Sequence, residues 1–184
     1  MYQSILCLVA LNENSRRVVK QAKALSERFD AQLRLLHVVE YVPLTGTEDA
    51  MLTAPIPIAE ELESQARAFV TQLADDFALA PGSISVVNGD LTTELETHIQ
   101  RDKIDLVVIG NHCRSGLAAL FNHAEDTVLH RCACDMLISG GSANGCEVVL
   151  FQVCAECGWH QSRSVMLNHD ATESDLGHLV GDEF

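Results

Sequence analysis

The sequence predicts an α/β protein with a doubly wound, five-stranded parallel sheet. Short apolar runs alternate with stretches in which apolar residues recur at helical spacing, which is the order of a β-α-β chain. The runs are continuously apolar, as in strands that helices cover on both faces. A length of 184 residues allows one domain with a good core.

Five apolar runs supply the expected strands, over residues 5 to 9, 33 to 39, 84 to 87, 106 to 109 and 134 to 138. Helical spacing predicts helices over residues 18 to 29, 62 to 77 and 91 to 99, and another before the last strand. Asn12, Asn14 and Ser15 are candidate caps for the first helix, and Asp90 for the third. Residues 40 to 57 contain three prolines and predict an irregular connection on the ligand side of the sheet.

Residues 104 to 139 organise the chain around one loop. The buried run that ends at Ile109 leads into Gly110, and a second glycine follows at Gly116. Ligands of open α/β sheets bind beyond the carboxyl ends of the strands. A small-molecule site is therefore expected in the loop of residues 110 to 116.

These residues resemble the universal stress protein family. Residues 110 to 117 are similar to the start of the motif G-x2-G-x9-G-[ST], and three other patterns are similar in order: Leu35-Leu36-His37-Val38, Gly89-Asp90-Leu91 and the strand Cys134-Asp135-Met136-Leu137-Ile138. The resemblance covers about residues 3 to 139. It implies a Rossmann-like fold of the adenine nucleotide α-hydrolase-like type, with strand order 3-2-1-4-5.

The motif is degenerate. Cys113 stands at the second glycine, and the closing Gly-[Ser/Thr] falls on His123-Ala124, or on Asn122-His123 if the spacing is one shorter. Ala10 occupies the position at which nucleotide-binding members carry an aspartate. A phosphate cradle needs bare backbone N–H groups, so ATP binding is expected to be weak or absent, and no cofactor is assigned.

One alternative stays open. Gly110, Asn111, His112, Arg114, Gly116 and His123 would form a noncanonical site if a nucleotide or another anion binds. No catalytic motif is present, and a triad of His112, Ser115 and Asp126 would need supporting geometry, so no enzyme activity is expected. His37 lies within an apolar strand and is interpreted as a hydrogen-bonded structural residue.

The net charge of -14 argues against direct nucleic-acid or membrane contact. No run is long enough to span a bilayer and no signal peptide is recognised, which predicts a cytoplasmic protein. The seven cysteines are then expected to be free thiols.

Two parts are expected, a universal-stress-type domain over residues 1 to 139 and a C-terminal extension over residues 140 to 184. Glycines at 140 to 145 predict a flexible break, and residues 147 to 153 suit an edge strand or a surface that packs on the body or on a dimer partner. Cys154, Cys157 and His160 have the spacing of half a zinc site, but without a second ligand pair no metal is predicted.

The leading hypothesis is a cytosolic universal stress protein that does not bind ATP and acts in stress resistance through protein interaction. The resemblance implies a homodimer through the last sheet strand, around Met136 and Ile138, together with an unidentified protein partner. A nucleotide-binding stress sensor with a rewritten loop is the first alternative. A phosphate-ester hydrolase on the same fold is the second.

Overall fold

The computed structural model describes residues 2–40, 56–80, 82–111, 134–142, 145–153 and 160–167. Within these segments the elements are β1 (Ser4–Leu8), α1 (Ser15–Phe29), β2 (Gln32–Val39), α2 (Ile56–Asp76), β3 (Ile84–Asn88), α3 (Leu91–Asp102), β4 (Leu106–Asn111), β5 (Asp135–Ser142), β6 (Gly145–Val153) and β7 (His160–Leu167). The predicted strands and helices are present, except that the helix expected before β5 lies outside the described residues. Helix α2 begins at Ile56, so the last two residues of the predicted connection belong to a helix, with Pro57 in its first turn, where proline is tolerated.

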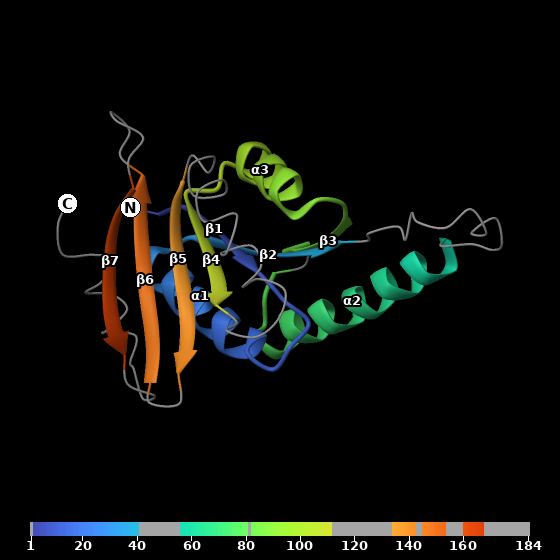
Figure 1. Cartoon of the computed structure of the whole chain (residues 1–184), viewed down its shortest axis with the longest axis horizontal. Helices are drawn as coiled ribbons and strands as arrows, with labels where there is room; N and C mark the ends of the chain where they lie inside the picture. Colours follow the sequence, from blue (N-terminus) through green and yellow to red (C-terminus); the bar gives the residue numbers. More distant parts are fainter. Residues whose placement is uncertain are drawn as a thin grey trace, which may run out of the picture.

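One sheet runs through the molecule in the order β3-β2-β1-β4-β5-β6-β7 (Figure 1). The first five strands are parallel, which confirms the predicted order 3-2-1-4-5. Strands β6 and β7 continue the sheet in antiparallel fashion. The sequence of the extension had allowed an edge strand, and the structure places two.

Helices cover both faces of the parallel part, as a doubly wound fold requires. Alternate residues of β1 separate the two cores, because Ile5 packs with α1 and α2 whereas Leu6 packs with α3. Figure 1 shows α1 and α3 on opposite sides of the sheet. The central strands are buried on both faces, with Leu106, Val107 and Val108 all at 0% exposure, and this explains their continuous apolar sequence.

Strand β5 is not an open edge. Its residues pair with β4 on one side and with β6 on the other, and the pairing with β6 extends from Met136–Phe151 to Ser142–Gly145. Gly140 and Gly141 therefore continue β5, and the predicted flexible break is wrong for these residues. With β6 in place, the backbone around Met136 and Ile138 has no free edge for the predicted dimer contact.

Three helix ends share one geometry. The chain leaves each helix through a left-handed residue that is not glycine: Asp30 (φ 54°), Ala78 (φ 49°) and Lys103 (φ 51°). The next residue's N–H donates to a carbonyl five positions back, for example from Ala31 to Ser26 at 2.9 Å and from Ile104 to Ile99 at 3.0 Å. This is the Schellman arrangement, in which the last helical carbonyls find donors.

Asp90 caps helix α3, as predicted. Its Oδ1 accepts from the Thr93 backbone N–H at 2.9 Å, and this hydrogen bond is the main reason that the Asp90 pKa lies below its usual value. Asp90→Ala is expected to lower the free energy of unfolding by about 1 kcal/mol at neutral pH, whereas Asp90→Asn retains an acceptor and loses less. Chemical denaturation at several pH values checks this.

The sign of the pH dependence follows from the lowered pKa. Ionised Asp90 stabilises the fold above the unfolded-state pKa of about 3.9, and this stabilisation is lost as the pH falls through the lower folded-state value. The difference between wild type and Asp90→Ala should therefore shrink below about pH 4. A difference that grows in acid would contradict the assignment.

Candidate functional site

The candidate site lies at the carboxyl edge of the sheet, where β1 and β4 end side by side. From β1 the chain continues to β2 on one side, and from β4 it continues to β5 on the other side. The order in which strands are added to the sheet therefore changes direction between β1 and β4. Such a switch point is the usual ligand site of an open α/β sheet. Ala10 follows β1, and Gly110 and Asn111 end β4.

The turn after β1 satisfies its polar groups locally. The Ala10 carbonyl accepts from the Asn12 N–H at 3.0 Å and also from the Ser15 hydroxyl, and Asn12 Oδ1 accepts from the Asn14 N–H at 3.0 Å. Asn14 occupies the N-cap position of α1, but its side chain does not make the cap hydrogen bond that was predicted. The Ala10 carbonyl and the Asn12 side-chain oxygen are therefore both engaged within the turn.

A small hollow lies beside this turn. Among the described residues, the hollow at this edge has a volume of about 10 Å³ and is lined by Leu8, Ala10, Asn12, Asn14, Ser15, Val18 and Gly110. That volume corresponds to about one water molecule at most.

Gly110 has a packing role. A Cβ atom at this position would lie 2.7 Å from Val18 Cγ2, closer than Cβ contacts in proteins. Helix α1 thus approaches β4 so closely that only hydrogen is accommodated there. The glycine that the sequence assigned to a phosphate loop is explained by contact between a helix and the sheet.

The other predicted site residues are not brought together by the described structure. His112, Arg114, Gly116 and His123 lie outside the described residues, as do Cys113 and Ala124. Gly110 and Asn111 pair with Ser139 and Gly140 of β5. The predicted nucleotide or anion site therefore stays a prediction.

His37 lies near the same edge and is structural, as interpreted. Its Nδ1 donates to the Val9 carbonyl at 2.7 Å, which ties β2 to the end of β1. The ring is half-buried. Because the nitrogen that faces the sheet already has a backbone partner, His37 acts as a tie between strands.

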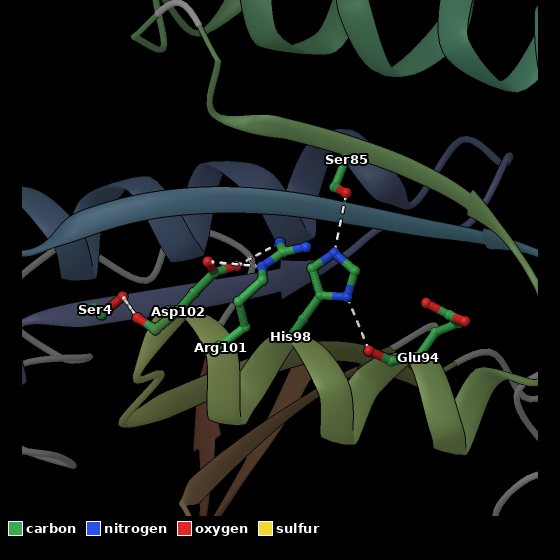
Figure 2. Close-up of polar contacts among 6 residues, drawn as sticks. All are labelled: Ser4, Ser85, Glu94, His98, Arg101 and Asp102. Carbon is green, nitrogen blue, oxygen red and sulfur yellow. Dashed lines mark hydrogen bonds and ion pairs between the residues drawn. The ribbon is translucent and has the colours of Figure 1, made fainter.

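A second histidine was missed by the sequence interpretation. His98 of α3 is 2% exposed, and Figure 2 shows its ring between the α3 backbone and Ser85 of β3. Nδ1 lies 2.8 Å from the Glu94 carbonyl, and Nε2 lies 3.0 Å from Ser85 Oγ. A carbonyl only accepts, so Nδ1 carries the proton and the Ser85 hydroxyl donates to Nε2. The available signal was the spacing of His98 with Leu91 and Leu95 on the buried face of α3.

This pair is expected to stabilise the fold. Ser85→Ala leaves the buried Nε2 of His98 without a partner and should lower the free energy of unfolding by about 1 to 2 kcal/mol. Adding His98→Leu removes both polar groups and should recover part of that loss. Urea denaturation of the single and double variants measures the coupling, and fully additive losses would contradict it.

Figure 2 also shows that the end of α3 is tied to the beginning of β1. The Ser4 hydroxyl donates to the Asp102 carbonyl at 3.4 Å, and Arg101 donates to the Asp102 carboxylate at 2.8 Å. The Arg101 guanidinium is the main reason that the pKa of Asp102 is lowered. This polar cluster lies at the amino edge, opposite the candidate site.

Cysteine and metal chemistry find no support among the described side chains. Cys7 and Cys134 are buried and form no disulfide, and burial raises the pKa of the Cys7 thiol to about 12, so its reactive thiolate is not formed near neutral pH. No group of three or more potential metal ligands occurs in the described part of the chain. Cys154 and Cys157 lie outside the described residues, and His160 is the first residue of β7.

The helices that the structure describes are too short or too polar to cross a bilayer.

Comparison with known proteins identifies the family. The profile of the Universal stress protein family matches residues 1–139. The chain is 30% identical over 137 residues to Universal stress protein A homolog 2 of Coxiella burnetii, covering 74% of this chain and 93% of that protein. It is 25% identical over 136 residues to homolog 1 of the same organism, covering 74% and 94%. The universal stress protein UspA from Lactobacillus plantarum has the same fold, with a TM-score of 0.55 at 20% identity, covering 74% and 97%. The chain belongs to the universal stress protein family, and the match ends where the C-terminal extension begins.

Proposed function

We propose that this chain is a cytosolic stress-resistance protein that acts through protein contacts and does not use ATP as a ligand or substrate. Family membership supports a stress-related role. The observation that carries the absence of ATP is the degenerate motif, whose closing Gly-[Ser/Thr] falls on His123-Ala124 or on Asn122-His123.

Three further features support this proposal. The position that holds an aspartate in nucleotide-binding members is Ala10, whose backbone carbonyl is engaged by Asn12 and Ser15. Gly110 is required by its contact with Val18, so its presence does not argue for a phosphate loop. Cys113 then places a side chain where the motif has bare backbone.

Direct nucleotide measurements test the proposal. Freshly purified protein, when denatured, should release no stoichiometric adenine nucleotide in mass spectrometry. Titration with ATP and magnesium should give a Kd above about 1 mM, since each missing hydrogen bond to a charged group weakens binding by about 1.5 to 3 kcal/mol. Stoichiometric ATP binding, or ATP hydrolysis by the purified chain, would reject the proposal.

A matched variant makes the negative result informative. Ala10→Asp combined with Cys113→Gly restores two motif positions and should bind ATP more tightly than the wild type does. Circular dichroism establishes that the variant is folded. Equal and negligible binding by both proteins would show that these two positions are not what prevents binding.

We also propose a homodimer, with the contact placed at the outer strand β7. Among the described strands β7 is the outermost, because β6 occupies the edge of β5. Edge strands present unpaired backbone groups to a partner. The amide hydrogen exchange of residues 160 to 167 should therefore become slower as the protein concentration rises. A chain that remains monomeric in sedimentation at about 100 times its cellular concentration would contradict the proposed dimer.

A further inference from the structure

The described sheet has two outer strands, β3 and β7, which lie at opposite ends of it (Figure 1). Outer strands present unpaired backbone groups, and these pair with strands of other chains. If both edges accepted a strand, β7 of one molecule would pair with β3 of the next, and head-to-tail contacts of this kind do not close. The chain would then assemble into open filaments.

The pairing of β3 with β2 determines which backbone groups of β3 face outward. The Ser83 carbonyl accepts from β2 at 2.7 Å, and the Gly89 N–H donates to β2 at 3.3 Å. Along a parallel strand, every second residue bonds to the same neighbouring strand. The intervening residues therefore direct their backbone N–H and C=O groups away from β2, and these residues are Ile84, Val86 and Asn88.

Helix α2 places an arginine at this free edge. The helix packs against β3, because Ala66 and Val70 belong to the same buried cluster as Val86. Arg67, which lies next to Ala66 in α2, donates from Nη2 to the Val86 carbonyl at 3.5 Å. Val86 is the middle one of the three outward-facing residues. The guanidinium thus occupies the place that an N–H group of an added strand would need.

Glu63 keeps this guanidinium in position. Its Oε1 accepts from Arg67 Nη2 at 2.9 Å, and its Oε2 accepts from the side-chain amide of Asn88 at 2.7 Å. The hydrogen bond with Arg67, and after it the one with Asn88, lowers the pKa of Glu63, so the carboxylate is ionised at neutral pH. An added strand would have to displace this charged group, and native sheets keep their edges unpaired with charged side chains in the same way.

We propose that the bridge formed by Glu63, Arg67 and Asn88 blocks the addition of a strand at β3 and so restricts self-association to β7. Association through β7 alone joins two identical edges, and such a contact closes after two chains. The restriction to β7 rests on the dimer proposed above, whereas the blocking of β3 does not depend on it.

The test removes the bridge from the full chain. In Arg67→Ala, the amide exchange of Ile84, Val86 and Asn88 should slow at least about tenfold over a rise in protein concentration of about a hundredfold, because the freed edge pairs with another chain. In the wild type, the exchange of these three amides should not depend on concentration. Light scattering should detect particles larger than two chains for Arg67→Ala only, since both edges then pair.

Two further variants complete the test. Arg16→Ala is the matched control, because it removes from α1 an arginine of similar side-chain exposure, 58% against 54%, and should behave as the wild type does. Exposed ion pairs contribute little to stability, so Arg67→Ala is expected to fold, which circular dichroism establishes. If it does not fold, Glu63→Ala removes the group that positions Arg67 and should slow the same amides at least about threefold. A folded variant whose β3 amides behave as in the wild type would overturn the proposal, as would a wild type whose β3 amides slow with concentration.

The exchange of residues 160 to 167 separates this result from the proposed dimer. If it does not depend on concentration in the wild type, the dimer at β7 is rejected, and with it the restriction of association to that strand. The β3 amides of Arg67→Ala still decide whether the bridge blocks the edge. In that case the variant should reach a mass of two chains and not exceed it.

Discussion

Removal of residues 143 to 184 is expected to move self-association of the chain from β7 to β5. The remaining five parallel strands correspond to the part that matches relatives over 93% and 94% of their length, so this part contains a complete family domain. Without β6, the backbone groups of residues 136 to 142 lose the partners that they have in the full chain. Exposed edges of this kind pair with other chains.

Light scattering coupled to size-exclusion chromatography checks this result. The truncated chain should show a mass that rises with concentration, and its β5 amides should exchange faster in the dilute sample than those of the full chain. A matched control is the chain ending at residue 167, which retains β6 and β7 and should behave as the full chain does. A strictly monomeric truncated protein with full protection of β5 would contradict the prediction.

Gly110→Ala is expected to lower the free energy of unfolding by about 2 to 3 kcal/mol. The added Cβ would lie 2.7 Å from Val18 Cγ2, and valine in a helix has essentially one rotamer, so the methyl group cannot turn away. Overpacking in a core of this kind costs about 1 to 3 kcal/mol. Thermal and urea denaturation measure the loss.

A second substitution separates the steric cause from other causes. Val18→Ala removes the atom that the new Cβ would meet, so the double variant should be less destabilised than the sum of the two single variants. If the two losses simply add, the close contact between α1 and β4 is not the reason for the glycine.

The parallel sheet could be predicted because its sequence signals are local. Continuous apolar runs mark strands buried on both faces, and Leu106, Val107 and Val108 are buried as that pattern requires. The Asp90 cap was likewise predictable from a residue type and its place before an apolar helix. These features depend on neighbours within a few positions of the chain.

The remaining features depend on partners far apart in sequence. A glycine at position 110 is compatible with either a phosphate group or a valine side chain as its neighbour. Only the packing of α1 against β4 decides between the two. Gly140 and Gly141 suggest a break by composition, yet pairing with β6 makes them strand.

The left-handed ends of the three helices have a consequence for the free energy of the whole molecule. Asp30, Ala78 and Lys103 each adopt a conformation that costs a residue with a Cβ about 1 kcal/mol relative to glycine. The sites lie on separate helices, so exchange to glycine at all three would add up to roughly 3 kcal/mol, a large share of the 5 to 15 kcal/mol typical of domains. The chain therefore lacks a free energy of unfolding that its fold could provide. This is expected when selection requires stability above a threshold and not the maximum that the fold permits.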